Sequence, residues 1–448
     1  LTVSGDAVTV EEDPSGQHAG PDSGEVVRLP LRLTAAKPSG PVRIDYRLAL
    51  GSYEQTGSMR LGSIFDPSGA AVTGASIDRW KYGARGAWTW RGDTDLYDPA
   101  TWQSIEGLTP CFALARRFQM PHTMLLSAGL SLDQETSEKH SQAMGLDRRS
   151  HEIPEFARWL REQVHLETEM DWPIAPEKPY ACELGNHYWL HYGTHASADE
   201  ANQWQTWVGP GLGGYAWTDA EAGDPLQEQT DNSLKCVETF ERVLGFTPTV
   251  WGIPGRANDR YTPQAIEASG MAVASDSNCQ RFVNVFCQPP PHHPKGTERL
   301  VELSKKYPGD PLYGNQLATL KYWTAHAHRH GRVMVFMAHH HLRGWEAASC
   351  FRLTEEMLRH VLADYHGDLY VATMTAIGLY WERVLCPEHR CVSVETGPGP
   401  AVTVRNTGDV DLDGLPVTVT FAGGRRTLAL VDVPAGGTAT VDWPKGTP

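Results

Sequence analysis

The chain has 448 residues, which at ~100–200 residues per domain corresponds to roughly two to four domains. Hydrophobic residues make up 40% and charged residues 21% of the chain, a composition that excludes disordered and fibrous proteins. The 54 acidic residues outnumber the 39 basic residues and give a net charge of -15, so neither nucleic acid nor an anionic membrane surface is an expected partner. No run approaches the ~20 consecutive apolar residues of a membrane-spanning helix, so we expect no membrane insertion.

Strand patterns fill the first part of the chain. Apolar and polar residues alternate between residues 24 and 85, most regularly over 27–33 and 42–50. A period of two is typical of half-buried antiparallel strands, and turn signals rich in Gly and Pro separate the runs. We therefore predict an N-terminal β-rich domain over residues 1–86.

Helical and strand patterns alternate in the middle of the chain. Apolar residues recur at helical spacing over residues 156–164 and 357–365. Four short apolar runs have the length of buried strands and cover residues 123–126, 271–274, 333–337 and 369–372. Helices that alternate with buried strands are typical of an α/β protein, so we predict an α/β layer or barrel over residues 87–385.

The strand pattern returns after Cys391, with alternating apolar residues over 402–404, 417–421 and 428–430. Glycine-rich turns separate these runs, as in a β-sandwich. We predict a small C-terminal β-sandwich over residues 386–448, near the lower size limit for independent folding.

The eight cysteines include one closely spaced pair, Cys386 and Cys391, which could close a small loop as a disulfide. The sequence lacks the two C-x-x-C knuckles of a zinc ribbon, so a structural zinc site of that type is not expected. Both an exported protein with roughly one to three disulfides and a protein with eight reduced, buried cysteines fit the sequence, and we favour the first. The chain begins at Leu1 without a leader, so we expect a trimmed form of a secreted, cell-surface or periplasmic protein.

The most specific chemical feature is a pair of histidines, His187 and His191, in the segment Glu-Leu-Gly-Asn-His-Tyr-Trp-Leu-His over residues 183–191. In a helix, residues four apart lie on the same face, so the two imidazoles could converge on one divalent ion. His195 would extend the row as a ligand or a substrate contact. Two unrelated surface or core histidines are the alternative.

A metal held by two imidazoles also needs a carboxylate, and Asp93 and Asp95 are the candidates. They follow an apolar and aromatic run that we expect to be the first core strand. Acidic residues at the carboxyl end of a strand face the open mouth of an α/β barrel. Alternatively, the two aspartates cap or turn the loop that follows the strand.

Two further segments carry polar groups at the ends of apolar strands. One strand end breaks into a loop that contains Pro254 and Arg256, and a helix follows. An apolar strand over residues 333–338 ends in three histidines, of which His339 and His340 come first. Packing alone does not explain this cluster, because a buried imidazole costs free energy unless it is hydrogen-bonded.

These four segments, in this order, resemble the polysaccharide deacetylase family of carbohydrate esterases, which includes chitin and peptidoglycan deacetylases. The segment around His187 resembles the family's metal-binding motif E-(I/L)-G-N-H-T-x-S-H and differs from it at Tyr188 and Leu190. Asp93 and Asp95 stand where the family has two adjacent aspartates, although one residue separates them here.

The resemblance extends to the loop and to the histidine run. Pro254 matches the family's arginine–proline segment, but Gly252 stands at the position of the arginine. Arg256 or Arg91 is the candidate replacement. His339 resembles the family's closing histidine, which acts as the general acid. The two β-rich ends lie outside the resemblance.

The resemblance implies a distorted (β/α) barrel of the polysaccharide deacetylase type, flanked by the N-terminal β-rich domain and the C-terminal β-sandwich. It also implies metal-assisted amide hydrolysis, with a divalent ion, expected to be Zn²⁺, that leaves positions open for water and the acetyl oxygen. The implied ligands are Asp95, His187 and His191. Asp93, oriented by Arg256 or by Arg91, would act as the base, and His339 would protonate the leaving sugar amine.

The implied substrate is a carbohydrate that contains N-acetyl amino sugars, and several aromatic residues fit such a substrate. Flat rings can stack on the apolar faces of pyranoses. The candidate substrate contacts are Trp189, His195, Trp207, Trp217, Pro254 and His340. The tryptophans could instead form a minor core beneath a long loop.

Other functions remain open from sequence. The same barrel and metal ligands would serve a deacylase of another amide or of a small amino sugar. A glycoside hydrolase would need two carboxylates flanking the scissile bond, for which Asp93 and Asp276 could be proposed. A catalytically inert carbohydrate-binding surface protein would have no reason to retain a set of metal ligands. The sequence leaves the oligomeric state open.

Overall fold

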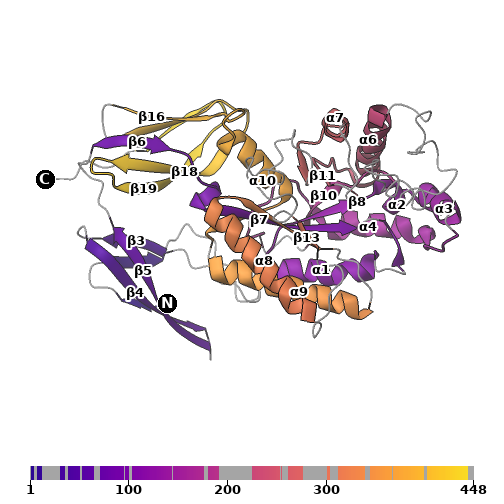
Figure 1. Cartoon of the computed structure of the whole chain (residues 1–448), viewed down its shortest axis with the longest axis horizontal. Helices are drawn as coiled ribbons and strands as arrows, with labels where there is room; N and C mark the ends of the chain where they lie inside the picture. Colours follow the sequence, from indigo (N-terminus) through magenta and orange to yellow (C-terminus); the bar gives the residue numbers. More distant parts are fainter. Residues whose placement is uncertain are drawn as a thin grey trace. The chain divides into compact units, whose positions relative to one another are not determined.

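The computed structural model describes residues 2–4, 8–12, 31–35, 39–50, 53–64, 71–94, 96–99, 103–143, 145–175, 180–190, 225–252, 254, 261–275, 300–302, 311–338, 344–365, 367–397 and 401–441. Contacts divide the chain into two units (Figure 1). Unit 1 combines Leu1–Asp78 with Cys391–Pro448, and unit 2 is Arg79–Arg390. The two β-rich ends, which the sequence suggested as separate domains, therefore belong to one unit.

Unit 2 is built on a parallel β-sheet. Its strands in chain order are β7 (Gly86–Thr94), β8 (His122–Leu126), β9 (His165–Leu166), β10 (Ala181–Asn186), β11 (Val250–Gly252), β12 (Val273–Ser275), β13 (Leu300–Glu302), β14 (Val333–Ala338) and β15 (Leu369–Val371). They lie in the order β12-β11-β10-β8-β7-β14-β13, and β15 and β9 pair with β7 and β10. Every one of these pairings is parallel.

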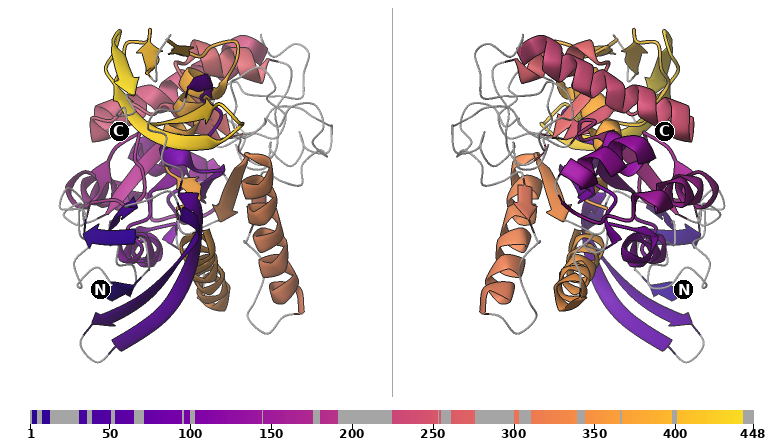
Figure 2. Two further views of the ribbon diagram at one scale, coloured as in Figure 1. Left: turned by 90° about the vertical axis from the view of Figure 1, so that its left-hand side faces the viewer. Right: turned by 90° about the vertical axis from the view of Figure 1, so that its right-hand side faces the viewer.

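The helices of unit 2 alternate with these strands, which confirms the predicted α/β class. They are α1 (Ile105–Arg117), α2 (Ala128–Ser131), α3 (Gln134–Ala143), α4 (Ile153–Gln163), α6 (Pro225–Leu244), α7 (Thr262–Ala268), α8 (Pro311–His330), α9 (Gly344–Tyr365) and α10 (Met374–Tyr380). A π-helical turn, Trp381–Leu385, continues α10. α9 packs against α8 and α1, whereas α2, α4 and α7 pack against α6. α6 is the long pink helix in the right-hand view of Figure 2.

The sheet of unit 2 is strongly curled. β8, β10 and β11 lie between β7 and β12, so a flat sheet would separate β7 from β12 by about 19 Å. Arg91 on β7 nevertheless donates from Nη1 to Ser275 Oγ on β12 at 2.8 Å. An arginine side chain cannot span the flat distance, so the sheet must curve until these two strands face each other.

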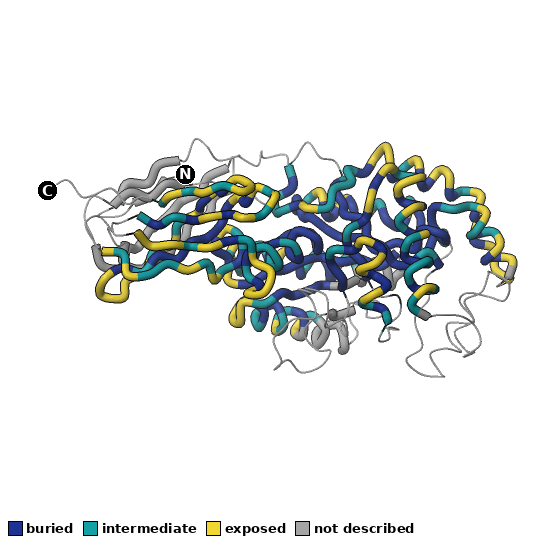
Figure 3. Tube along the Cα trace, turned by 90° about the horizontal axis from the view of Figure 1, so that it is seen from above, coloured by how far each residue is buried: buried dark blue, intermediate teal, exposed yellow. Residues whose placement is uncertain are grey.

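The two faces of the curled sheet carry different residues. Apolar side chains of β8 and β10 form a core with the helices that cover the outer face. This core includes Phe112 of α1, Phe156 and Leu160 of α4, Leu184 of β10 and Phe240 of α6. The apolar stripe predicted over residues 156–164 thus marks the buried side of α4. β7, β8, β10, β11, β12 and β15 are buried along their length, whereas the helices carry exposed residues (Figure 3).

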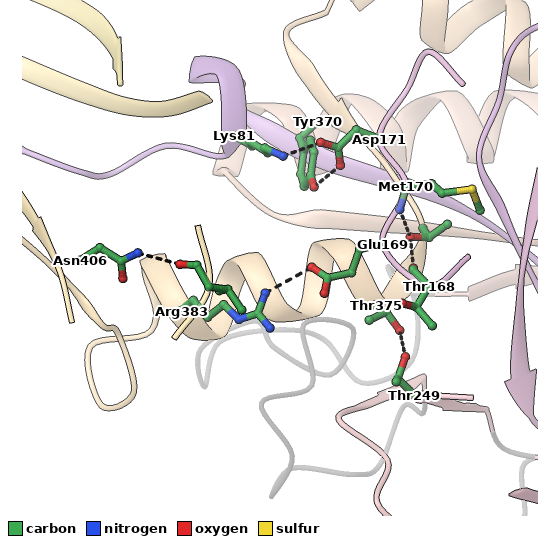
Figure 4. Close-up of polar contacts among 12 residues, drawn as sticks. Lys81, Thr168, Glu169, Met170, Asp171, Thr249, Tyr370, Thr375, Arg383 and Asn406 are labelled. Carbon is green, nitrogen blue, oxygen red and sulfur yellow. Dashed lines mark hydrogen bonds and ion pairs between the residues drawn. The ribbon is translucent and has the colours of Figure 1, made fainter. Parts of the chain in front are cut away.

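A polar network fixes the start of α10 (Figure 4). Asp171 accepts hydrogen bonds from Lys81 Nζ and Tyr370 Oη, both at 2.6 Å. Thr373 Oγ1, just before α10, donates to Thr168 O at 2.6 Å and accepts from Met170 N at 3.1 Å. These bonds tie the segment after β9 to β15 and α10.

Unit 1 consists of antiparallel strands, as the alternating sequence patterns predicted. Its strands are β1 (Thr2–Ser4), β2 (Val8–Glu12), β3 (Leu31–Ala35), β4 (Ser39–Leu50), β5 (Tyr53–Ile64), β6 (Val72–Ser76), β16 (Val392–Thr396), β17 (Val402–Asn406), β18 (Leu412–Phe421), β19 (Arg426–Val433) and β20 (Thr438–Val441). The sheets are β1-β4-β5, β2-β3, β16-β17-β20 and β19-β18-β6. β6 comes from the N-terminal part of the chain and completes a sheet of the C-terminal part.

The cysteines that the structure describes differ from the disulfide-bonded state that we favoured. Cys182, Cys236 and Cys386 are free thiols, and all three are buried. The predicted disulfide between Cys386 and Cys391 is therefore wrong. The Cys391 side chain packs instead against Gly408, where an added Cβ would lie 2.8 Å from Sγ.

Within the described residues, none of the helices combines the length and the apolar character that crossing a membrane requires.

Candidate active site

Polar side chains gather on the inner face of the curled sheet, where β7, β8, β10 and β11 approach their carboxyl ends. The register aligns Asp93 with Leu125 and Leu125 with Gly185. A Cβ at Gly185 or at Gly252 would overlap a terminal methyl group of Leu125. These two glycines therefore leave the space that Leu125 fills beneath the polar groups.

Arg91 and Asp93 form a buried ion pair on this face. Arg91 Nε lies 2.7 Å from Asp93 Oδ1, and Arg91 Nη2 lies 2.7 Å from Asp93 Oδ2. The third nitrogen, Nη1, donates to the side chain and the carbonyl of Ser275. Relative exposure is 1% for Arg91 and 4% for Asp93. Every nitrogen of the guanidinium is thus engaged, and both carboxylate oxygens are held in one orientation.

Gly252 makes room for this guanidinium. A Cβ at Gly252 would lie 3.1 Å from Arg91 Nη2 in addition to overlapping Leu125. A side chain at position 252 would therefore crowd the observed Arg91 conformation as well as displace Leu125. Of the two arginines named as replacements for the family's arginine, Arg91 contacts Asp93, and Arg256 lies outside the described residues.

His187 follows a strand, and the predicted helical placement of the histidine pair is wrong. β10 ends at Asn186, and Tyr188 has a left-handed backbone with φ 61°. All six residues of β10 are buried, so the strand shows no alternation of apolar and polar residues. The spacing of four residues between His187 and His191 fits one turn of a helix, but His187 stands in the loop that follows β10.

The imidazole of His187 is buried and oriented by β11. Nδ1 lies 2.8 Å from Gly252 O, and because a carbonyl can only accept, Nδ1 carries the proton. In the neutral ring the lone pair is then on Nε2. Ser127 Oγ donates to His187 O at 2.8 Å, which fixes the backbone as well. A carbonyl that orients a ligating imidazole is the usual second contact of a metal-binding histidine, so His187 fits a divalent ion.

Two asparagines shape the turn around His187. Asn186 Nδ2 donates to Ser233 Oγ at 2.8 Å, and Asn186 Oδ1 accepts from Tyr188 N at 2.8 Å. Asn232 Oδ1 accepts from Trp189 N at 2.8 Å. These roles of the two asparagines were not predicted from the sequence. For Asn186 the signal was its place in the histidine motif, whereas nothing in the sequence marked Asn232 or Ser275.

The structure describes two of the candidate substrate contacts. Trp189 is half-buried against the core, with Lys235 Nζ 5.1 Å from its ring centre. Pro254 is buried just after β11. The remaining candidates lie outside the described residues: Asp95, His191, His195, Trp207, Trp217, Arg256, His339 and His340. The described part of the site therefore holds Asp93, with Arg91, and one of the three expected metal ligands, His187.

Glu183 is a second buried carboxyl group, from the same motif. Burial raises the pKa of Glu183 to about 7, although hydrogen bonds from Thr123 and from the backbone of α10 lower it. Oε2 accepts from Thr123 Oγ1 at 2.5 Å and from Met374 N at 3.1 Å. Glu183 thereby joins β10 to β8 and to the start of α10.

No protein-family model matches the chain, and no curated protein matches it by sequence. Solved structures similar to it include a Mycobacterium smegmatis protein described as a polysaccharide deacetylase, with 13% identity over 69% of this chain and 94% of that one and a TM-score of 0.40. A Pseudomonas aeruginosa protein described in the same way has 13% identity over 67% and 92% of the two chains and a TM-score of 0.40. A peptidoglycan deacetylase from Bacillus subtilis has 11% identity over 68% and 95%, with a TM-score of 0.33. Polysaccharide and peptidoglycan deacetylases, which the sequence motifs resemble, are thus among the structures similar to this chain.

Proposed function

We propose that the chain is a metal-dependent hydrolase that removes N-acetyl groups from an amino-sugar polysaccharide or oligosaccharide. The observation that carries the proposal is the buried Arg91–Asp93 ion pair on the inner face of the sheet. Burying two charges has a large desolvation cost, so a purely structural role is a poor reason to keep them there. The oriented imidazole of His187 on the same sheet supplies a metal-ligand type of the kind that this chemistry needs.

Asp93 is the proposed general base. A carboxylate has about four lone-pair positions, and Arg91 occupies one on each oxygen. A remaining lone pair can accept the proton of an attacking water. Arg91 is a positioning residue, because it holds the carboxylate plane without touching the substrate.

His187 would hold the divalent ion through Nε2, with Asp95 and His191 as the other proposed ligands. When bound, a divalent ion lowers the pKa of water and polarises the acetyl carbonyl group. His339 is the proposed acid that protonates the leaving sugar amine. With one group to take a proton and another to give one, the chain's own residues can carry both proton transfers of amide hydrolysis.

The test measures metal content and acetate release together. We expect the purified chain to bind a divalent ion and to release acetate from N-acetylated amino-sugar polymers in a reaction that a chelator stops. In His187→Ala acetate release should fall to the level of the chelator-treated enzyme. His151→Ala, in which an exposed histidine of the same unit is removed, is the matched control and should keep full activity.

Two outcomes would overturn the proposal. One is full acetate release by His187→Ala. The other is the absence of acetate release from every polymer tested, even after addition of Zn²⁺ or Co²⁺, which would favour the catalytically inert carbohydrate-binding protein.

A further inference from the structure

A second group of metal-ligand types lies at the end of unit 2, beyond α10 and its π-helical turn. Cys386 Sγ, a Glu388 carboxylate oxygen and a His389 ring nitrogen all lie within 4.8 Å of one another. No other group of three or more histidine, cysteine, aspartate or glutamate side chains in the described part of the chain meets this condition. We call these three residues the Cys386 cluster.

A tight backbone turn holds the Cys386 cluster together. Cys386 N donates to Trp381 O at 2.7 Å, which anchors the turn to the preceding helix. Cys386 O accepts from Arg390 N at 2.9 Å and from His389 N at 3.3 Å, so the chain folds back over Cys386. Pro387 restricts the backbone between the first two members. Because the turn already brings the three side chains together, binding of a metal ion would cost little backbone conformational entropy.

The three side chains are available for binding. Cys386 is a free thiol with a relative exposure of 3%, whereas Glu388 and His389 are exposed. Glu388 and His389 side chains form no hydrogen bond or ion pair with any residue that the structure describes. The cluster therefore combines a protected sulfur with two side chains that can turn toward it.

We infer that the Cys386 cluster is a metal site for Zn²⁺ or a similar borderline cation. Zn²⁺ binds sulfur at about 2.3 Å and nitrogen or oxygen at about 2.0–2.2 Å, so its ligand atoms lie roughly 3.5 Å apart. The ligand atoms lie within 4.8 Å of one another, so reaching that spacing needs only a small approach, which rotation of two exposed side chains can supply. A thiolate ligand selects against Mg²⁺ and Ca²⁺, which prefer oxygen.

The charges at the site balance. Coordination releases the proton of the Cys386 thiol to solvent, and the resulting thiolate and the Glu388 carboxylate neutralise the dication. His389 contributes a neutral nitrogen. Three protein ligands leave the fourth tetrahedral position to water. Neither the sulfur atom nor the metal ion changes its oxidation state on binding.

This site is independent of the proposed deacetylase centre, whose ligands are one carboxylate and two imidazoles. Only the Cys386 cluster contains sulfur. A thiolate bound to Co²⁺ gives a charge-transfer absorption in the near ultraviolet, which a site of nitrogen and oxygen ligands lacks. Titration of the reduced, metal-free full chain with Co²⁺ therefore distinguishes the Cys386 cluster from the proposed deacetylase centre, and the Cys386→Ser variant assigns the band to this cluster.

The expected result is a charge-transfer band that saturates by about two Co²⁺ per chain, since the proposed deacetylase centre also takes up Co²⁺, and that Zn²⁺ abolishes by competition. Cys386→Ser should remove the band, whereas Cys391→Ser, at the neighbouring cysteine, should keep it. His389→Ala and Glu388→Gln should weaken Co²⁺ binding by on the order of 10–100-fold. His187→Ala should leave the band unchanged, which separates this result from failure of the proposed function.

The inference is overturned if excess Co²⁺ produces no band in the wild-type chain, or if the band survives Cys386→Ser. Cys386 is buried, so its variant must first match the unfolding temperature of the wild-type chain without metal. If Cys386→Ser unfolds at a lower temperature than the wild-type chain, the test uses His389→Ala, at an exposed position. Unchanged Co²⁺ affinity in His389→Ala overturns the inference, and a weakened affinity supports it.

Discussion

Arg91 binds Asp93 with a planar fork, and this geometry distinguishes arginine from lysine at position 91. Arg91→Lys keeps the charge, but a single ammonium cannot hold both oxygens of Asp93 and also reach Ser275, 2.8 Å from Nη1. We expect acetate release to fall by about 10²-fold, mainly in kcat, because Asp93 loses its orientation. Steady-state kinetics of Arg91→Lys and the wild-type chain measure the effect. The control is Arg85→Lys, at an exposed arginine whose Nε lies 3.4 Å from Asp368 Oδ2, and it should keep the wild-type kcat.

Measurements of unfolding free energy distinguish two roles of Arg91, which are to orient the Asp93 carboxylate and to compensate its buried charge. Arg91→Met leaves the carboxylate buried without its cation, which costs roughly 3–5 kcal/mol of unfolding free energy. Arg91→Met with Asp93→Asn removes both charges and should recover much of the stability without recovering activity. Wild-type kcat in Arg91→Lys would contradict the positioning role.

Glu183 makes the stability of the chain depend on pH. Its pKa of about 7 in the folded chain lies above the ordinary value of 4.5, so the folded chain keeps a proton that the unfolded chain releases. This contribution is fully present below the unfolded value and is lost as pH rises through the folded value. It corresponds to roughly 3 kcal/mol.

Glu183→Gln cannot ionise and keeps an oxygen acceptor for Thr123. We therefore expect its stability relative to the wild-type chain to increase as pH rises from about 5 to about 8. Denaturant unfolding at several pH values measures the difference. Glu162→Gln, at an exposed position of α4, is the control and should follow the wild-type profile. Parallel profiles for Glu183→Gln and the wild type would contradict the buried, protonated carboxyl group.

At the scale of elements, strands bounded by turns could be predicted from apolar runs alone. The runs over 123–126, 333–337 and 369–372 correspond closely to β8, β14 and β15. β10 escaped prediction because burial on both faces removes any period, and the spacing of two histidines then suggested a helix. Residue type and motif were enough to name Asp93 and His187 as candidate site residues. The motif alone left the choice between Arg91 and Arg256 open, although Arg91 and Asp93 are two residues apart on β7, a spacing that places both side chains on one face of a strand.

Gly252 on β11 gives a test of how the inner face is packed. Gly252→Ala places a methyl group against Leu125 and 3.1 Å from Arg91 Nη2, so we expect a loss of about 1–3 kcal/mol in unfolding free energy and a lower kcat. In a Leu125→Ala background the same substitution should cost much less. Gly74→Ala, in β6, is the control, because its Cβ would meet no atom within 4 Å. Equal costs in both backgrounds would contradict the packing described.

At the scale of the whole molecule, the sequence predicted strands at both ends of the chain without revealing that they pair. Thr73 Oγ1 of β6 donates to Thr420 O of β18 at 3.2 Å, and 347 residues separate the two positions. Alternation of apolar and polar residues identifies a strand but does not name its partner. The three predicted domains therefore became two units, one of them discontinuous in sequence.

The pairing of β6 with β18 can be tested with two shortened chains, one that begins at Ala71 and one that begins at Arg79. They differ by residues 71–78, which comprise β6, the one residue before it and the two residues after it. Without β6, the edge of β18 next to the buried residues Val417, Val419 and Phe421 loses its backbone partner. We expect hydrogen exchange in Leu412–Phe421 to be faster, and proteolysis within residues 391–441 to be quicker, in the chain that begins at Arg79. Equal protection of β18 in both chains would mean that β6 is dispensable, and that residues 391–448 fold without the N-terminal part.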